Sequence, residues 1–509
     1  MKHAAKVFSA ATIGLDAVTV EVEAHVGRAL PGVVIVGLPD ASVQEAKERV
    51  KSAIANSGLP FPQSRVTVNL APGDVKKAGP LYDLPIAISM LAADNEVALT
   101  RSFEHTLLVG ELALNGAVRR VAGVLPIALH AVASGFTEII VPAENAREAA
   151  LVDGLTVYEA TSLSDVVRYF LGEEVFAPQP ATAWQRVARR RGGIDFSAIQ
   201  GQQHVKRALE IAAAGGHNIR MIGPPGSGKT LLARALTTIL PAPSKSEALE
   251  VTKIYSTADL LGDRHLVDER PFRSPHHTTS HVALVGGGTH ARPGEISLAH
   301  RGVLFLDEFP EFPRQALEAL RQPLEDGVVV VSRAAGTFTY PAQFMLVTAE
   351  NPCPCGFATD PTQMCVCTDT SLAKYKRRLS GPLLDRIDLH VPVPKLDVQT
   401  LTTGEPAESS EQVRIRVEQA RARQEVRQLQ TGVVANAELS SEQVRQYCPL
   451  PPDAEKLLET AIERLNLSAR AYYRVRRVAQ TIADLAGRDQ IVVADVAEAL
   501  QYRDNDTGS

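Results

Sequence analysis

The sequence predicts a multidomain α/β protein whose C-terminal part is entirely helical. The chain has 509 residues, more than one hydrophobic core usually serves, so two or three domains are expected. Strand-like apolar runs alternate with helical patterns up to about residue 395, whereas long amphipathic helical patterns fill the remainder. With 45% hydrophobic and 22% charged residues, the composition is that of an ordinary soluble globular protein.

Composition and charge argue against several classes of protein. No apolar run is long enough to cross a bilayer, and the start of the chain lacks the apolar stretch of a secretory signal. A cytoplasmic protein without a membrane partner is therefore expected. The net charge of −5 does not indicate a nucleic-acid binder. A sum over the whole chain, however, would not reveal a basic inner surface in a ring-shaped assembly that is acidic outside. Four of the five cysteines are clustered, which favours a metal or redox site over a disulfide framework.

Residues 1–172 are predicted to form a first domain of α/β or α+β type. The strand-like runs are residues 18–22, 33–36, 65–70 and 138–141. From residue 40 to 57 apolar positions recur at three- and four-residue spacing, which is typical of an amphipathic helix. Ser42 and Glu45 predict a capping box at its start, and Gly58 marks its end.

A linker is predicted at residues 173–194. Proline and small polar residues at 178–182 indicate a chain break, and a basic run follows it. We interpret this run as solvated linker, with contact to a phosphate backbone as the alternative. Its members are Arg186, Arg189, Arg190 and Arg191.

Two further domains are predicted after the linker. Residues 195–395 combine apolar strands with helices and contain the motifs described below. Residues 396–509 are predicted to be all-helical, with amphipathic helices at 411–430, 453–465 and 469–486.

A phosphate-binding loop follows a short apolar strand at residues 218–222. Its pattern, G-x-x-x-x-G-K-T, lies between that strand and a helix predicted at 231–240, which is the context the motif requires. Backbone N–H groups and the helix N-terminus can surround phosphates there. Lys229 is predicted to reach the β- and γ-phosphates of ATP, and Thr230 to bind Mg²⁺. The loop residues are Gly223, Pro224, Pro225, Gly226, Ser227, Gly228, Lys229 and Thr230.

Two adjacent carboxylates complete the predicted nucleotide site. The apolar run 303–306 reads as a buried parallel strand that ends in Asp307 and Glu308. Asp307 is predicted to hold the Mg²⁺ shell, and Glu308 to orient the attacking water. Lys229 and Asp307 lie 78 positions apart, whereas a strand–helix–strand unit needs only about 30 residues. The excess predicts an insertion.

Five segments carry longer motifs: residues 271–277 (PFRSPHH), 284–288 (LVGGG), 293–302 (PGEISLAHRG), 381–389 (GPLLDRIDL) and 467–472 (LSARAY). Together they resemble the ComM/YifB family of magnesium-chelatase-like AAA+ ATPases, and the resemblance covers nearly the whole chain. It implies an AAA+ P-loop core with a helix-2 insert and a helical lid of the magnesium-chelatase type. It also implies assembly into an ATP-induced homo-hexamer.

The resemblance assigns catalytic roles to three further residues. Asn351 matches the sensor-1 residue that helps to position water, and Arg386 matches the arginine finger that reaches a neighbouring subunit's site. Arg470 matches the sensor-2 arginine of the lid. A guanidinium stabilises the charge of a phosphoryl transition state. The alternatives are a surface salt bridge for Arg386, and one of the nearby arginines in place of Arg470, namely Arg474, Arg476 or Arg477.

Substrate contacts are expected on the insertion and on a hairpin. Residues 328–332 and 337–340 flank Arg333-Ala334-Ala335-Gly336, a hairpin pattern, and in relatives both elements face the pore of the ring. The resemblance therefore makes four residues candidates for DNA contact, with packed structural loops as the alternative. These are Arg273, His276, His277 and Arg333.

The clustered cysteines form two C-x-C pairs directly after Asn351. Four thiolates suit a structural tetrahedral Zn²⁺, with free thiols or redox chemistry as the alternatives. The cysteines are Cys353, Cys355, Cys365 and Cys367. The fifth, Cys448, is expected to be a packed residue.

The first domain resembles the Lon-protease-like domain of ribosomal-S5-type fold that precedes the motor in this family (ChlI-type). Residues 77–83 correspond to the Lon segment with the nucleophilic serine, but Leu81 stands in its place. The segment expected to supply the catalytic lysine reads LPIA at 125–128. Without a nucleophile and an amine base the domain is predicted to be proteolytically inactive.

The function expected from the resemblance is ATP-driven DNA translocation. The family's role is branch migration of recombination intermediates during natural transformation, with single-stranded and branched DNA as partners. The alternatives are a protein-remodelling ATPase and the motor subunit of a metal chelatase. The chelatase motor usually lacks the Lon-like domain and the cysteine cluster. An unfolding pore usually carries an aromatic loop, to which Phe338 and Tyr340 are the nearest approach.

Overall fold

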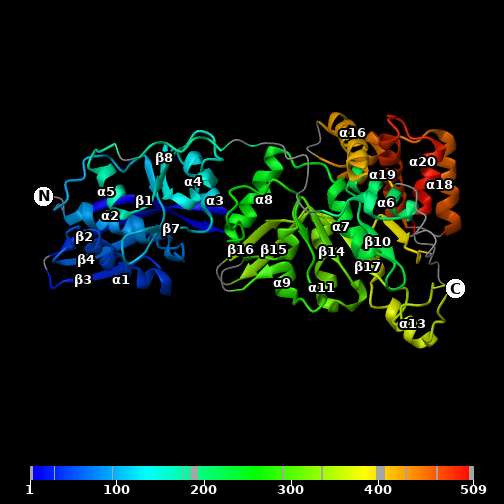
Figure 1. Cartoon of the computed structure of the whole chain (residues 1–509), viewed down its shortest axis with the longest axis horizontal. Helices are drawn as coiled ribbons and strands as arrows, with labels where there is room; N and C mark the ends of the chain where they lie inside the picture. Colours follow the sequence, from blue (N-terminus) through cyan, green and yellow to red (C-terminus); the bar gives the residue numbers. More distant parts are fainter. Residues whose placement is uncertain are drawn as a thin grey trace. The chain divides into compact units, whose positions relative to one another are not determined.

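The computed structural model divides the chain into two compact units (Figure 1). The first consists of residues 1–185 and 245–267, and the second of residues 186–244 and 268–509. The basic residues predicted in the linker lie outside the described part of the chain. The structure describes residues 4–27, 29–94, 96–174, 176–182, 184, 193–288, 292–333, 336–360, 362–396, 407–429, 433–465 and 468–503.

A mixed seven-stranded sheet forms the centre of the first unit, in the order β3-β4-β2-β1-β5-β8-β9. β2 pairs antiparallel with β1 and β4, and the remaining neighbours are parallel. The four strands expected from the sequence are confirmed as β2, β3, β4 and β8. The strands are β1 (Ala4–Ile13), β2 (Asp16–Gly27), β3 (Gly32–Val36), β4 (Arg65–Ala71), β5 (Thr106–Leu108), β8 (Glu138–Pro142) and β9 (Thr156–Ala160).

Helix α1 (Ala41–Asn56) confirms the predicted amphipathic pattern but not its predicted cap. Val43, Ala46, Val50 and Ile54 are fully buried. The capping box at Ser42 and Glu45 is wrong, because Ser42 already lies inside the helix. The N-cap is Asp40, whose extended backbone lets its carboxylate accept a hydrogen bond from the Val43 N–H at 2.9 Å.

Helix α8 (Lys245–Thr257) belongs to the first unit although it follows the phosphate-binding loop in sequence. It packs on α3 and buries Ala248, Val251 and Ile254. The Gly123 N–H donates to the Ser256 carbonyl at 3.1 Å. The other helices of this unit are α2 (Asp83–Asp94), α3 (Val124–Ala133), α4 (Ala143–Ala149), α5 (Leu163–Phe170) and the 3-10 turn η1 (Pro80–Tyr82), with a small hairpin of β6 (Glu111–Leu112) and β7 (Val118–Arg119).

A five-stranded parallel sheet forms the centre of the second unit, in the order β11-β14-β17-β10-β18. The strands expected at 218–222 and 303–306 are confirmed to within one residue. The strands are β10 (Ile219–Ile222), β11 (Phe272–Arg273), β14 (Val303–Leu306), β17 (Met345–Glu350) and β18 (Leu389–Pro392). Because all five run parallel, their carboxyl ends share one edge of the sheet.

The predicted hairpin forms between β15 (Val328–Arg333) and β16 (Gly336–Pro341), which pair antiparallel. Its central residues Ala334 and Ala335 lie outside the described residues. The insertion before β14 contains several short elements. These are α9 (His281–Val285), β12 (Gly286–Gly287), β13 (Arg292–Pro293) and α10 (Glu295–Leu298).

Helices cover the sheet of the second unit and form its C-terminal part (Figure 1). α16 and α19 pack on α6, and the helices expected after residue 396 are confirmed as α16, α18 and α19. No helix in the described part of the chain is both long and apolar enough to span a membrane. The helices are α6 (Gln203–Gly215), α7 (Lys229–Ile239), α11 (Arg314–Ala319), α12 (Arg321–Asp326), α13 (Asp369–Lys376), α14 (Gly381–Leu384), α16 (Ser410–Gln428), α17 (Ser441–Tyr447), α18 (Pro452–Leu465), α19 (Ala469–Leu485) and α20 (Val493–Gln501), with the 3-10 turns η2 (Phe196–Ala198), η3 (Phe309–Glu311) and η4 (Asn436–Glu438).

Candidate nucleotide site

The phosphate-binding loop runs from the end of β10 into α7 at the carboxyl edge of the parallel sheet. Gly226 and Gly228 have φ angles of +75° and +89°, a left-handed conformation that glycine adopts without steric cost. At Gly223 a Cβ atom would lie 2.1 Å from the carbonyl oxygen of Val393, so no larger residue fits there. The strand–loop–helix context expected from the sequence is present.

Lys229, the first residue of α7, turns its amine back into the loop. Its Nζ donates to the carbonyl oxygens of Gly223 and Pro224 at 2.7 and 2.9 Å, and to Oδ1 of Asn351 at 3.3 Å. Burial lowers the pKa of Lys229, and the carboxylate of Asp307 opposes that change. The predicted sensor residue Asn351 thus contacts the loop lysine directly.

Thr230 and Asp307 meet at the position predicted for magnesium. The hydroxyl of Thr230 donates to Oδ2 of Asp307 at 2.7 Å, and Oδ1 of Asp307 accepts the Glu308 N–H at 3.0 Å. A hydroxyl and a carboxylate side by side are the hard oxygen ligands that Mg²⁺ prefers. The residues present fit this ion, bound together with phosphate oxygens.

Glu308 contacts a residue that the sequence analysis assigned to a different role. Its Oε2 lies 2.8 Å from Nδ1 of His277, a candidate for DNA contact. Its backbone is left-handed, with φ +53°, which costs a non-glycine residue on the order of 1 kcal/mol. Parallel pairing of β11 with β14 aligns Arg273 with Leu304. His277 and Glu308 each lie four residues beyond that pair.

Arg386 and Arg470 belong to one positively charged cluster. Arg386 donates to the carbonyl oxygen of Pro382 at 2.7 Å and contacts the carboxylate of Glu325. Burial lowers the pKa of Arg386, as do the positive charges of Arg470, Arg474 and Arg321. The two predicted catalytic arginines therefore lie near each other in the same chain.

A buried network near that cluster connects the sheet to the C-terminal helices, and the sequence analysis did not identify it. Nδ1 of His217 lies 3.2 Å from Oδ2 of Asp388, and its Nε2 lies 2.8 Å from the hydroxyl of Thr481 on α19. Arg474 approaches Asp388 within 3.6 Å. Burial would raise the pKa of Asp388, but the His217 hydrogen bond and the nearby arginines outweigh it and hold that pKa well below its usual range.

The four cysteines of the cysteine loop (residues 353–367) lie within 4.8 Å of one another, measured between sulfurs. Sγ of Cys353 is 3.3 Å from that of Cys355 and 3.8 Å from that of Cys365, and Cys355 and Cys365 are 3.6 Å apart. Sulfurs around a tetrahedral zinc with bonds of about 2.3 Å lie about 3.8 Å apart. The cluster fits such an ion. Cys448 is buried separately, as expected.

Backbone donors also support a thiolate in this cluster. The N–H groups of Phe357 and Val366 hydrogen-bond to the sulfur of Cys355 and lower its pKa to about 6. Metal-bound thiolates commonly accept such bonds because the thiolate form is the ligand.

The candidates for DNA contact differ in how the structure places them. Arg273 is held by Glu295 through two hydrogen bonds of 2.6 and 2.7 Å. His276 is exposed and its ring lies 4.1 Å from that of His277. Arg333 is the last residue of β15, opposite Gly336.

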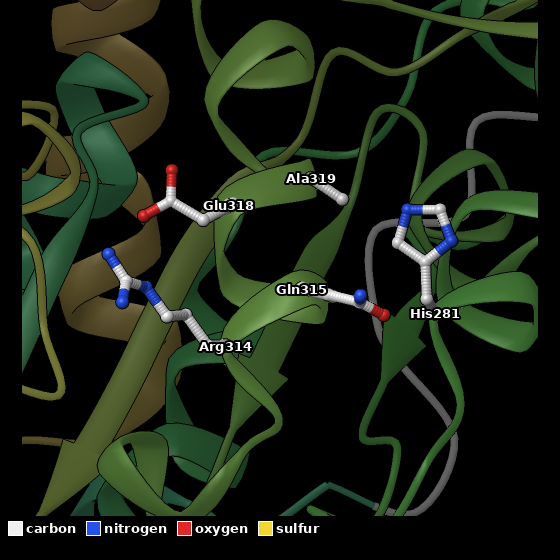
Figure 2. Close-up of a pocket in the computed structure, with 5 residues that line it drawn as sticks. All are labelled: His281, Arg314, Gln315, Glu318 and Ala319. Carbon is white, nitrogen blue, oxygen red and sulfur yellow. The ribbon is translucent and has the colours of Figure 1, made fainter.

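An open surface pocket of about 590 Å³ lies between α9 and α11 (Figure 2). It is lined by His281, Arg314, Gln315, Glu318 and Ala319. None of the residues predicted for nucleotide, metal or DNA lines it. Figure 2 shows Arg314 and Glu318 projecting from the same side of α11, one turn apart.

The positions matched to the Lon catalytic residues are packed in the first unit. Leu81 is buried in η1, and Leu125, Ile127 and Ala128 are fully buried in α3. A nearby carboxylate, Asp83, is also buried and forms two hydrogen bonds with the guanidinium of Arg49, at 2.7 and 2.9 Å.

Family profiles match three stretches of the chain. Residues 195–401 match magnesium chelatase, subunit ChlI; residues 22–145 match subunit ChlI of Mg-chelatase; and residues 407–503 match the C-terminal part of that subunit. The second match lies in the first unit and the third in the second unit, whereas the match to residues 195–401 lies in the second unit except for residues 245–267.

Curated proteins match over the full length. The chain is 44% identical to the competence protein ComM of Haemophilus influenzae over 98% of its own length and 97% of that protein. It is also 44% identical to YifB of Escherichia coli, over 98% of the chain and 96% of that protein. The magnesium-chelatase 38 kDa subunit of Rhodobacter capsulatus is 29% identical over 32% of the chain and 52% of that subunit. The chain belongs to the ComM/YifB family of magnesium-chelatase-like AAA+ ATPases.

Proposed function

We propose that this protein is an ATP-driven, hexameric DNA translocase that promotes branch migration of recombination intermediates during natural transformation. The observation that carries the proposal is the 44% identity, over 98% of the chain, to a protein named for competence. The complete set of phosphate-binding, magnesium-binding and water-orienting side chains supports the ATPase part.

In the proposed reaction each side chain of the site has a separate task. Lys229 binds the β- and γ-phosphates, and the backbone of the loop surrounds them. Thr230 and Asp307 would hold Mg²⁺, which would neutralise negative charge on the phosphates. Glu308 orients and polarises the attacking water. Asn351 is a second contact of that water.

A ring follows from the role proposed for the arginines. Arg386 supplies its guanidinium to the site of the neighbouring subunit, and Arg470 acts as the sensor of the lid. Because the finger comes from a neighbour, a single subunit should hydrolyse ATP slowly, and ATP should drive assembly.

The remaining parts of the chain have supporting tasks in this proposal. The cysteine loop binds a structural Zn²⁺, supported by sulfur separations close to those of a tetrahedral site. The insertion and the β15–β16 hairpin contact DNA through Arg273, His276, His277 and Arg333. The Lon-like first domain carries out no proteolysis and assists ring assembly or partner binding.

The test is ATP hydrolysis and strand displacement by the assembled ring on forked and branched DNA across a series of salt concentrations. DNA should stimulate hydrolysis, and Arg333→Ala should lower the slope of affinity against salt by about one unit with little regard to sequence. Arg423→Ala, which removes an exposed charge paired with Asp489, is the matched control and should leave the slope unchanged. If an assembled ring is neither stimulated by DNA nor able to unwind it, the proposal fails and protein remodelling takes its place.

A further inference from the structure

The cysteine loop contacts the phosphate-binding loop at one backbone position. Gly356 directly follows Cys355, is buried, and has a φ angle of +88°. A Cβ atom added there would lie 2.6 and 2.7 Å from Cδ and Cγ of Pro225. Real Cβ atoms do not approach other atoms so closely, so only glycine allows this contact. Pro225 is the third residue of the phosphate-binding loop, and its ring cannot rotate away.

A second contact joins the start of the cysteine loop to the same site. Asn351 precedes Cys353 by two residues, and its Oδ1 accepts a hydrogen bond from Nζ of Lys229 at 3.3 Å. The hydroxyl of Tyr375 donates to the backbone carbonyl of Asn351 at 3.2 Å. Tyr375 lies on α13, which begins two residues after Cys367. Both ends of the loop are therefore tied to Asn351.

A third contact fixes the far side of the cysteine loop. Asp360 pairs with Lys395 at 3.5 Å, and its Oδ1 accepts hydrogen bonds from the N–H and hydroxyl of Thr362 at 2.7 and 2.6 Å. Lys395 lies two residues beyond Val393, whose carbonyl oxygen faces Gly223. This ion pair links the cysteine loop to the segment that follows β18.

We propose that the cysteine loop is a metal-held brace that positions Pro225 and Asn351 for binding the phosphates of the nucleotide. The inference rests on the zinc site of the proposed function and extends it from a structural ion to one that sets nucleotide affinity. With four sulfurs bound to one ion, the two C-x-C pairs cannot separate, and Gly356 stays against the ring of Pro225. When the ion is lost, that constraint is lost, and the phosphate-binding loop and Asn351 become free to shift.

The contacts favour a brace over an independent stabilising element. A zinc cluster that only stabilised its own loop would need no close backbone contact with a catalytic loop. Here the residue after a metal ligand packs against Pro225 at a distance that excludes even a methyl group. The residue two positions before another ligand touches the catalytic lysine.

The experiment uses the full-length protein and two readouts, zinc content by elemental analysis and affinity for a fluorescent ADP analogue. Gly356→Ala should retain zinc but bind the analogue roughly tenfold more weakly, because the new methyl displaces Pro225. Cys365→Ser should lose zinc and weaken binding to a similar extent. Met364→Ala, at a position of the same loop that is 91% exposed, is the control and should match the wild type in both readouts.

Two additions separate the brace from a general loss of structure. The double variant Gly356→Ala/Pro225→Ala lacks the ring atoms that the methyl would meet, so it should bind more tightly than the sum of the two single effects predicts. Removing zinc from the wild type with a chelator should weaken binding, and adding Zn²⁺ alone should restore it. Melting curves verify that each variant is folded.

The outcomes distinguish the proposed brace from the proposed zinc site. Gly356→Ala with full zinc and wild-type affinity would overturn the brace and leave the zinc site standing. A wild type that contains no stoichiometric metal would overturn the zinc site and the metal-dependence of the brace together. If Gly356→Ala weakened binding of the ADP analogue in such a metal-free protein, the packing of Gly356 on Pro225 would still affect binding, but without any role for a metal.

Discussion

Nδ1 of His277 lies 2.8 Å from Oε2 of Glu308, so the insertion and the proposed water-orienting carboxylate are in direct contact. Both side chains are partly exposed, at 31% and 54%, and a contact between such exposed groups adds little to folding stability. The contact occupies one of the two oxygens with which Glu308 would orient water. It also places a candidate for DNA contact beside the carboxylate that would orient the water.

We expect His277→Ala to raise the basal turnover number for ATP. The turnover number should rise roughly two- to fivefold, which corresponds to the free energy that a half-exposed pair can contribute. KM for ATP should be nearly unchanged. Steady-state hydrolysis without DNA measures it. His281→Ala, on the same insertion but lining the surface pocket, is the control and should behave like the wild type. A fall in turnover in His277→Ala would mean that His277 assists Glu308 instead of restraining it.

Lys229→Ala should abolish nucleotide binding, whereas Glu308→Gln should bind ATP and hydrolyse it at least about a hundredfold more slowly. Lys229 Nζ lies among the carbonyl oxygens of the loop, while Glu308 takes no part in that cradle. Equilibrium binding and single-turnover hydrolysis separate the two effects. Near-normal turnover in Glu308→Gln would show that another residue orients the water.

Rings that mix Arg386→Ala subunits with Lys229→Ala subunits should recover part of the activity that each variant lacks alone. In such a ring the intact nucleotide site of an Arg386→Ala subunit can lie next to the intact Arg386 of a Lys229→Ala subunit. Activity of the wild type should also rise steeply with protein concentration, because assembly creates the complete site. Mixed rings of verified size without recovered activity would count against a finger supplied by the neighbour.

Asp388→Asn should lower the free energy of unfolding at neutral pH by roughly 3 kcal/mol, the cost of breaking a buried ion pair. The folded-state pKa of Asp388 is depressed, so its contribution is present above the unfolded-state value of about 3.9 and is lost as the pH falls below it. Urea unfolding at pH 7 and pH 2 should therefore show a smaller difference between variant and wild type at the lower pH.

The control for this prediction is Asp489→Asn, whose carboxylate is 82% exposed and pairs with Arg423. It should have little effect at either pH. Hydrogen exchange of α19 should respond to the Asp388 substitution, because Thr481 and Arg474 lie on that helix. An equal loss of stability at both pH values would mean that the effect comes from packing and not from charge.

Local patterns in the sequence predicted local structure well. The apolar spacing in α1 and the strands that flank the phosphate-binding loop depend on neighbours a few residues away, and they are confirmed. The cap of α1 was missed because Asp40 and Ser42 are both good capping residues, and backbone geometry selects between them.

The contacts that the sequence could not predict join residues far apart in the chain. His277 meets Glu308 through the register of β11 against β14, and Gly356 meets Pro225 through the packing of two loops. Neither relationship leaves a periodic signal. The resemblance of each segment to the family identified these residues individually, whereas the structure showed which of them are in contact.

The position of α8 determines which fragments of this protein can be soluble on their own. A fragment that starts at residue 186 would carry α8 without the helix it packs on, leaving Ala248, Val251 and Ile254 exposed to water. A fragment that ends at residue 185 would lack α8, and the face of α3 that receives it would be bare. Neither half should be soluble as a simple truncation. Separating them requires transplanting residues 245–267 onto the N-terminal piece and closing the gap between residues 244 and 268 with a short linker.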